Sequence, residues 1–319
     1  MKTILRCFAF AAALAPLASA AQNYPTRAVR LMVPFPPGGA TDIVGRLVAA
    51  KMQEVWGQPV VIENRPGAGT VVGTDYVAKS APDGHTLGTV VTAYVINPSL
   101  RADLPYNTLK DLAGVTQVSV QHLVMAAHPS LPANNIAELV ALAKKEPGKL
   151  SYATPGSGTA MHLSVELLKT TAGVELVHVP YKGGAPAQQD VMSGRVPILM
   201  DVLYAVRPLI KSGRIKVLAL LSPQRAAESP EYPVVAEAVP GVSALSLVGI
   251  VAPGATPRGL IDRISADIAG AVKSSDLTER MKQQGMVPIG STPDQFDALI
   301  RAEIEKWAKV VKISGAKVD

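Results

Sequence analysis

Three segments of the chain place glycine, proline and small hydroxyl residues directly after an apolar run. The first reads Val33-Pro-Phe-Pro-Pro-Gly-Gly-Ala-Thr-Asp42 and leads into an amphipathic stretch. Glycines let backbone N–H groups turn toward a ligand, and the N-terminus of a following helix adds free donors and partial positive charge. This pattern predicts anion binding. The alternative is a tight strand-to-helix turn with Thr41 or Asp42 as the N-cap.

Two later segments repeat this design. Ser151-Tyr-Ala-Thr-Pro-Gly-Ser-Gly-Thr-Ala-Met-His162 places Ser157, Gly158 and Thr159 at a helix start, and Val179-Pro-Tyr-Lys-Gly-Gly-Ala-Pro186 does the same around Gly183. Donor-rich loops at the carboxyl ends of strands are typical of small-ligand sites in open α/β sheets. Together the three loops favour a site for an anion or a carboxylate.

A catalytic interpretation starts from Ser157. With His162 and either Asp190 or Asp201, it would supply the groups of a hydrolase triad. Ser157 lies between Gly156 and Gly158, however, and not in the G-x-S-x-G turn that exposes a nucleophile. A secreted serine hydrolase using Ser157 and His162 is therefore the alternative hypothesis. A purely structural or partner-binding exported protein is the third.

Metal and cofactor sites find little support in the sequence. The five histidines include no i,i+4 pair, and the single cysteine is Cys7. The stretch Gly67–Gly73 is similar to a dinucleotide-binding loop, but its third glycine comes one place late. We expect no metal and no cofactor.

The N-terminus indicates the compartment. Lys2 and Arg6 precede an apolar stretch that ends in Ala18-Ser19-Ala20, an A-x-A cleavage site, so residues 1–20 are expected to be a signal peptide. Its removal leaves 29 basic and 25 acidic residues, a net charge of +4. This mild excess forms no basic block, and only 4% of the residues are aromatic, so nucleic-acid binding is not expected.

The loops must be positioned by an α/β framework. The chain has 319 residues, 48% of them hydrophobic, which allows a large core. Short β-branched runs alternate with amphipathic stretches, a pattern typical of parallel sheets covered by helices. The predicted strands are 29–33, 60–63, 87–91, 123–127, 150–153, 176–179, 196–200, 215–221 and 247–252. One helix should begin after the N-cap Asn135, and the last should run from about Pro293 to Ser314.

Nine strands favour two α/β domains. No Pro/Ser/Gly-rich linker divides the chain, so we expect continuous strands to cross between the domains.

These segments, taken in order, resemble one family over essentially the whole mature chain. The residues that carry the resemblance are Arg30–Asp42, Glu63–Gly69, Ala81–Gly84, Ile96–Ser99, Gly156–Thr159, His178–Gly183, Val251–Pro253 and Arg301–Trp307. They are similar to the solute-binding proteins of tripartite tricarboxylate transporters, the Bug family.

The resemblance implies a two-domain fold of the periplasmic-binding-protein type (type II), with a ligand cleft between the domains. It implies a first domain of residues 22–118 plus 239–319 and a second of residues 119–238. It also implies a monomeric periplasmic receptor, not an enzyme, that delivers a small carboxylate to membrane subunits of a transporter or to a sensor.

The family motifs imply the residues of the site. Ser157, Gly158 and Thr159 are expected to bind the proximal carboxylate directly. The loops around Phe35–Asp42 and Tyr181–Gly184 are expected to act as two pincers that hold ordered waters. The remaining residues expected to line the site are Phe35, Gly38, Gly39, Asp42, Gly183 and Asp201. Leu247, Met161 and Tyr94 depart from the family pattern near segments that can face the cleft, so its distal part is expected to be unusually apolar.

Overall fold

The computed structural model describes residues 24–316, and the predicted signal peptide lies outside the described residues. Its strands are β1 (Val29–Val33), β2 (Val60–Asn64), β3 (Thr86–Val91), β4 (Leu112–Ala127), β5 (Ser151–Thr154), β6 (Val177–Pro180), β7 (Ile198–Val202), β8 (Lys216–Leu220), β9 (Leu245–Pro253) and β10 (Met286–Pro288). The nine predicted strands are confirmed to within a few residues at most ends. The exception is β4, which begins eleven residues before the predicted 123–127 segment.

The helices lie between these strands and after them. They are α3 (Ala40–Trp56), η1 (Ala68–Thr70), α4 (Val71–Ala78), α5 (Ala93–Leu100), α6 (Ile136–Lys145), α7 (Ala160–Ala172), α8 (Gly184–Met192), α9 (Leu203–Lys211), α10 (Val235–Ala238), α11 (Arg258–Lys273), α12 (Ser275–Gln283) and α13 (Pro293–Ser314). The predicted cap of α6 is confirmed, since Asn135 accepts a hydrogen bond from the amide of Glu138 at 2.9 Å. None of the helices in the described residues is long and apolar enough to cross a bilayer.

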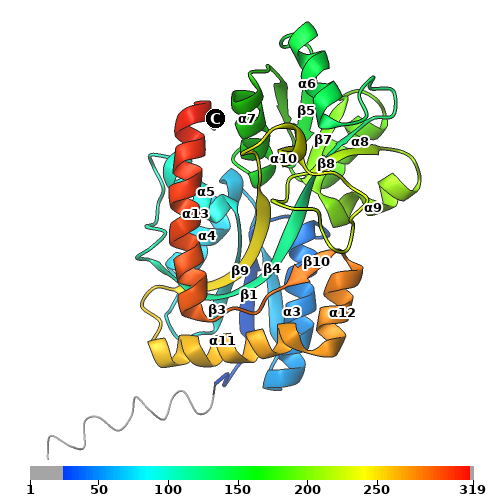
Figure 1. Cartoon of the computed structure of the whole chain (residues 1–319). Coiled ribbons are helices and arrows are strands. Elements are labelled where there is room, and N and C mark those ends of the chain that lie inside the picture. The colour runs from blue at the N-terminus through cyan, green and yellow to red at the C-terminus, as the bar shows by residue number, and fades with distance from the viewer. Residues whose placement is uncertain (1–23, 317–319) are drawn as a thin grey trace, which may run out of the picture.

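The strands form one curled sheet in the order β2-β1-β3-β9-β4-β7-β5-β6, with β8 and β10 also paired to β4. Pairs in the outer parts are parallel, as predicted, but every pair that includes β4 or β9 is antiparallel. The predicted parallel pairing therefore holds in the outer parts of the sheet and not at β4 and β9. The reason is that β4 carries the chain from one lobe to the other and β9 carries it back, so the two run in opposite directions (Figure 1).

The two lobes meet along β4. Its residues up to His122 pair with β9 or β10, and from Leu123 onward they pair with β7 and β8. We call the part containing β1, β2, β3, β9 and β10 the first lobe, and the part containing β5 to β8 the second lobe. The crossing is continuous strand, as the absence of a linker predicts. The exact domain boundaries stay a prediction.

The long helix α13 supports the crossing strands and also contacts α5 and α7. Its Phe296 is fully buried, and the ring lies directly over Gly249 of β9 and against Gly114 of β4. A Cβ atom on Gly249 would collide with that ring. The two glycines therefore let α13 approach the strands closely.

Candidate functional site

A cavity of about 480 Å³ lies between the lobes, where five helices begin. Residues at the N-termini of α3, α5, α7, α8 and α9 border it, among them Gly39, Ala93, Thr159, Gly183 and Tyr204. Each helix N-terminus offers unsatisfied N–H groups and a partial positive charge. At α3, α5, α8 and α9 the N-cap side chain accepts no hydrogen bond from the helix. Helix N-termini therefore border the cavity from both lobes.

The first loop is braced from behind by Asp42. Its carboxylate accepts hydrogen bonds from the amide of Gly38 (2.9 Å), from Arg46 Nε (2.8 Å) and from Asn64 Nδ2 (2.9 Å). Asn64 Nδ2 also donates to the carbonyl of Phe35 at 2.9 Å. Burial alone would raise the pKa of Asp42, but these hydrogen bonds and the Arg46 charge lower it below the usual value. The loop is thus held by an ionised carboxylate.

The structure corrects the predicted N-cap of the first loop. The N-cap of α3 is Gly39, not Thr41 or Asp42. Phe35, Gly38 and Gly39 border the cavity, whereas Asp42 is 1% exposed and does not. Asp42 therefore keeps its charge behind the loop, away from the residues that border the cavity.

The second loop ends in a capped helix. Thr159 is the N-cap of α7, and its hydroxyl accepts a hydrogen bond from the amide of His162 at 3.3 Å while donating to the carbonyl of Gly156 at 2.8 Å. Thr159 borders the cavity, as does Met161. Ser157 and Gly158 do not border it, and the amide of Gly158 donates to Nδ1 of His162 at 3.2 Å.

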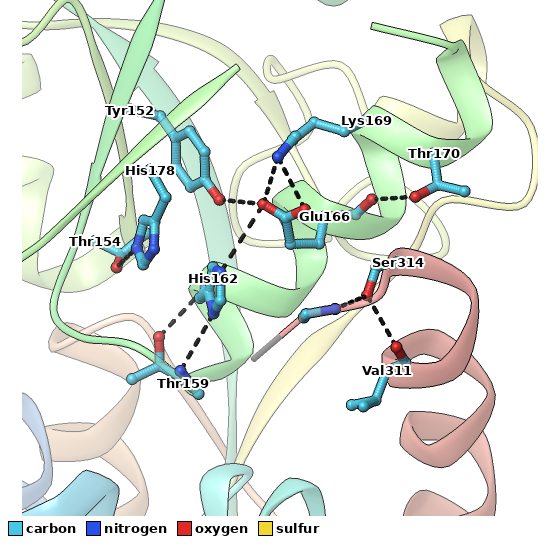
Figure 2. Close-up of polar contacts among 12 residues, drawn as sticks. Tyr152, Thr154, Thr159, His162, Glu166, Lys169, Thr170, His178, Val311 and Ser314 are labelled. Carbon is cyan, nitrogen blue, oxygen red and sulfur yellow. Dashed lines mark hydrogen bonds and ion pairs between the residues drawn. The ribbon is translucent and has the colours of Figure 1, made fainter. Parts of the chain in front are cut away.

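Behind this loop lies a buried cluster of aromatic and charged side chains (Figure 2). The rings of His162 and His178 stack at 4.0 Å, and Tyr152 stacks on the other side of His178 at 4.9 Å. Tyr152 donates to Glu166 at 2.7 Å, and Glu166 is paired with Lys169 at 2.8 Å. Burial lowers the pKa of both histidines, that of His178 to about 3, so both rings are neutral at pH 7.

The groups of the hydrolase hypothesis are not arranged as a triad. His162 Nδ1 accepts from Gly158, and its Nε2 lies 3.9 Å from Glu166, a carboxylate four residues along α7. Asp190 is bound by Tyr181 at 2.6 Å and by Arg195. Within residues 24–316, no group of three or more His, Cys, Asp or Glu side chains could hold a metal ion.

The third loop is tied to the second. The amide of Gly183 donates to the carbonyl of Pro155 at 2.8 Å, so the starts of α7 and α8 are held side by side. Gly183 and Gly184 border the cavity, and a Cβ atom on Gly184 would lie 2.9 Å from Asp201 Oδ2.

Asp201 borders the cavity and is 3% exposed. It accepts hydrogen bonds from Gln188 Nε2 (2.9 Å) and from the amide of Val202 (2.7 Å). Burial raises the pKa of Asp201 to about 6, although these two hydrogen bonds act in the opposite direction.

Ser157 lies instead at a contact between the lobes. Its carbonyl oxygen is 3.6 Å from the position that a Cβ atom would take on Gly69, and Arg101 Nη2 is 3.3 Å from the same position. The turn around Gly69 is strained, because the neighbouring Ala68 and Thr70 have φ values of 45° and 83°. Asn97 stabilises it by donating to the carbonyl of Gly69 at 3.1 Å.

The floor of the cavity contains residues that the sequence did not single out. Gln121 of β4 is paired with Ser246 of β9, and both border the cavity together with Tyr204 of α9. The sequence did not predict the first half of β4, which contains Gln121, because that stretch is polar.

Of the three departures from the family pattern, only Met161 borders the cavity. Tyr94 is buried with its hydroxyl on the carbonyl of Thr108, and Leu247 is buried in the core.

Comparison with known proteins gives one consistent result. The profile of the family described as "Tripartite tricarboxylate transporter family receptor" matches residues 44–316. The chain is 38% identical to Protein BugT of Bordetella pertussis over 301 residues, which cover 93% of this chain and 92% of that protein.

Two solved structures with bound ligands are also similar. Rpa4515 of R. palustris, solved with adipate, is 35% identical with a TM-score of 0.88, covering 92% of this chain and 100% of that one. MatC of Rhodopseudomonas palustris, solved with bound malate, is 30% identical with a TM-score of 0.84, covering 90% and 100%. Both of these proteins hold a small carboxylate.

Proposed function

Because the chain belongs to the tripartite tricarboxylate transporter receptor family, and is thus a non-enzymatic solute-binding receptor, we propose that it captures a small carboxylate in the cavity between its lobes. The alternative of a serine hydrolase using Ser157 and His162 is set aside by this membership. The relatives solved with adipate and malate support a carboxylate as the ligand.

The observation that carries the proposal is the convergence of five helix N-termini on one cavity. A carboxylate near one such terminus gains about 0.3–1 kcal/mol from the helix dipole, and each hydrogen bond to a charged group contributes about 1.5–3 kcal/mol. The described residues that line the cavity include no arginine, and their single lysine, Lys182, is exposed. Recognition of the anion therefore rests on backbone amides and small hydroxyls.

We place the proximal carboxylate between the first, second and third loops. Phe35, Gly38, Gly39, Thr159 and Gly183 border the cavity there. Ser157 and Gly158 remain proposed ligand contacts, made after the lobes close over the ligand. The amide of Gly158 would then have to give up its hydrogen bond to His162, which lies in the same lobe. Better contacts in the closed state would drive that hinge motion.

The receptor is proposed to act as a periplasmic monomer that delivers its ligand to transporter subunits in the membrane or to a sensor. The signal-peptide pattern of residues 1–20 supports export. We propose that the hinge separates residues 22–118 plus 239–319 from residues 119–238, in line with the change of strand partners along β4.

The test is a thermal-shift screen of the mature protein against mono-, di- and tricarboxylates and aromatic carboxylates, each beside its methyl ester, followed by calorimetry on the hits. We expect at least one acid to bind while its ester does not, because the ester lacks the charge that the helix N-termini stabilise. Equal binding of acid and ester would contradict the anion site. Binding of neutral or cationic compounds alone would contradict the carboxylate receptor.

A further inference from the structure

Asp201 supplies the one carboxyl group among the described residues that border the cavity. Its side chain is 3% exposed, and the hydrogen bonds that it accepts come from uncharged donors, Gln188 Nε2 and the amide of Val202. Asp42, by contrast, lies behind the first loop and is paired with Arg46. The wall of the cavity therefore contains an acidic group that no cation of the described residues neutralises.

Asp201 lies at the starts of two helices. It directly precedes Val202, the N-cap of α9, whose amide donates to Oδ1 at 2.7 Å. Its Oδ2 is 2.9 Å from the position that a Cβ atom would take on Gly184, the first residue of α8. Both helix starts border the cavity. The carboxylate of Asp201 therefore already uses part of the positive potential that two helix N-termini offer to an anion.

The ligand shares the start of α8 with Asp201. Its proximal carboxylate is placed beside Gly183, the N-cap of α8 and the neighbour of Gly184. Two carboxylates at one helix start repel each other, and a poorly solvated cavity screens this repulsion weakly. Charge acts through space, so the repulsion requires no contact between Asp201 and the ligand.

Protonation of one carboxyl group removes this repulsion. Asp201 takes up a proton more readily than the ligand does, because burial raises the pKa of Asp201 to about 6, against about 4 for an unperturbed carboxyl group. At pH 7 Asp201 is mostly ionised in the free receptor, and an added negative charge beside it raises its pKa further.

The helices and strand beside Asp201 supply no competing proton acceptor. α8 contributes Gln188, and Val124 of β4 lies opposite Asp201 in the sheet. On α9, burial and the nearby Asp201 raise the pKa of the Tyr204 hydroxyl, which stays protonated. Arg207 of α9 donates to the loop that precedes α10.

The other charged and titratable groups around β7 are engaged elsewhere. Asp190 of α8 is bound by Tyr181 and an arginine, and Lys182 before α8 is exposed. From β5 and α7, Tyr152, His162 and Glu166 belong to the buried cluster behind the second loop (Figure 2). Burial and two hydrogen bonds set the pKa of the Asp201 carboxyl, without a contribution from these charges.

We propose that capture of the ligand carboxylate is coupled to the uptake of one proton by Asp201, which is ionised in the free receptor and protonated in the complex. The proton comes from the solvent and returns to it when the ligand leaves. This inference rests on the proposed function, because it takes a ligand carboxylate at the start of α8 as given.

The experiment counts protons by calorimetry at pH 7.0 in phosphate and in Tris, two buffers whose ionisation enthalpies differ. The probes are adipate, malate, hexanoate and benzoate. Binding should take up close to one proton, and the Kd should rise by up to about tenfold per pH unit between pH 6.5 and 8.5. Binding without proton uptake and with a constant Kd would overturn the inference and leave the carboxylate receptor intact. Failure of these four probes, together with every acid in the wider screen, would contradict the proposed function itself.

Variants assign the proton to one residue. Asp201→Asn keeps the shape of the side chain and an oxygen for the Val202 amide but cannot titrate. It should bind without proton uptake, and at pH 8.5 it should bind about tenfold or more tightly than the wild type. Retention of the proton uptake in Asp201→Asn would overturn the assignment.

Asp297→Asn is the matched control. Burial also raises the pKa of Asp297, and its carboxylate likewise accepts a backbone hydrogen bond, from Gly114 at 3.1 Å, but it does not border the cavity. This variant should keep the proton uptake of the wild type, and an equal loss in it would overturn the assignment. Thermal denaturation shows whether each variant is folded, and the proton count on the wild type tests the proposal independently of the variants.

Discussion

His162 and His178 stack face to face behind the second loop, with ring centroids 4.0 Å apart and planes 9° from parallel. His162 accepts the amide hydrogen bond of Gly158, and His178 Nε2 lies 2.7 Å from the hydroxyl of Thr154. Two stacked imidazoles cannot both gain a proton without repulsion in this buried space. The loop is therefore held by rings that must stay neutral.

Acidification should destabilise the protein through His178. Its pKa is about 3 in the folded state against 6.5 for an unperturbed histidine, so between these values the unfolded state binds more protons. The contribution of His178 to stability is complete above about pH 6.5 and is lost as the pH falls, by up to about 1.4 kcal/mol per pH unit. Thermal denaturation between pH 7.5 and 4.5 measures this, and His178→Phe should show a smaller loss than the wild type.

Asp201 changes the pH dependence of stability in the opposite direction, so its contribution must be separated from that of His178. Its folded-state pKa of about 6 lies above the usual 3.8, so its contribution to stability grows as the pH falls through 6. Because Asp201 is present in both proteins, the difference between wild type and His178→Phe isolates the histidine. Parallel pH profiles for the two proteins would contradict the prediction.

Removal of the Asp42 brace should weaken both the fold and ligand binding. Asp42→Ala leaves the amide of Gly38 and Nδ2 of Asn64 without this acceptor, which should lower the free energy of unfolding by about 1–3 kcal/mol. Ligand affinity should fall about tenfold, because binding must then order the loop. Chemical denaturation and calorimetry give the two quantities.

The matched control for Asp42 is Asp262→Ala. Asp262 also pairs with an arginine at i,i+4 spacing, but its side chain is 51% exposed and far from the first loop in sequence. It should change stability little, as exposed ion pairs do. Similar losses in the two variants would show that the brace has no special role.

A side chain at Gly183 should block binding. Gly183 borders the cavity, and a Cβ atom there would meet nothing within 4 Å, so Gly183→Val would fill open space rather than the core. Gly241→Val is the control, since Gly241 also has a positive φ and open surroundings but does not border the cavity. Both variants should lose similar stability, and only Gly183→Val should lose affinity. Unchanged affinity in Gly183→Val would remove the third loop from the site.

Closure of the lobes should depend on Gly69. In Gly69→Leu the side chain would press on Arg101 and on the carbonyl of Ser157, and so hold the lobes apart. Gly57→Leu has nearly the same φ, 64° against 60°, and meets nothing within 4 Å. Each should cost about 1–2 kcal/mol of stability from backbone strain. Only Gly69→Leu should reduce ligand affinity in calorimetry. An equal affinity in the two variants would show that this contact plays no part in closure.

Much of the framework could be predicted because it follows local rules. The alternation of β-branched runs with amphipathic stretches located nine strands, and the Asn135 cap and the Pro293–Ser314 pattern located two helices. The first half of β4 was missed because its polar residues do not alternate like a half-buried strand. Thr116, Ser119 and Gln121 are nevertheless buried, since neighbours from distant parts of the chain cover them.

The sequence by itself determined the loop chemistry: glycine-rich turns before helix starts, with Ser157 outside any G-x-S-x-G turn. Only the tertiary structure decided which of those residues face a common cavity. It turned Asp42 inward as a brace, placed Ser157 at the contact between the lobes, and brought Gln121 and Tyr204 to the floor. The physical reason is that backbone turns and caps depend on neighbouring residues. The floor of the cavity depends on how the crossing strand β4 and the helix α9 bring together Gln121 and Tyr204, which are 83 residues apart in the chain.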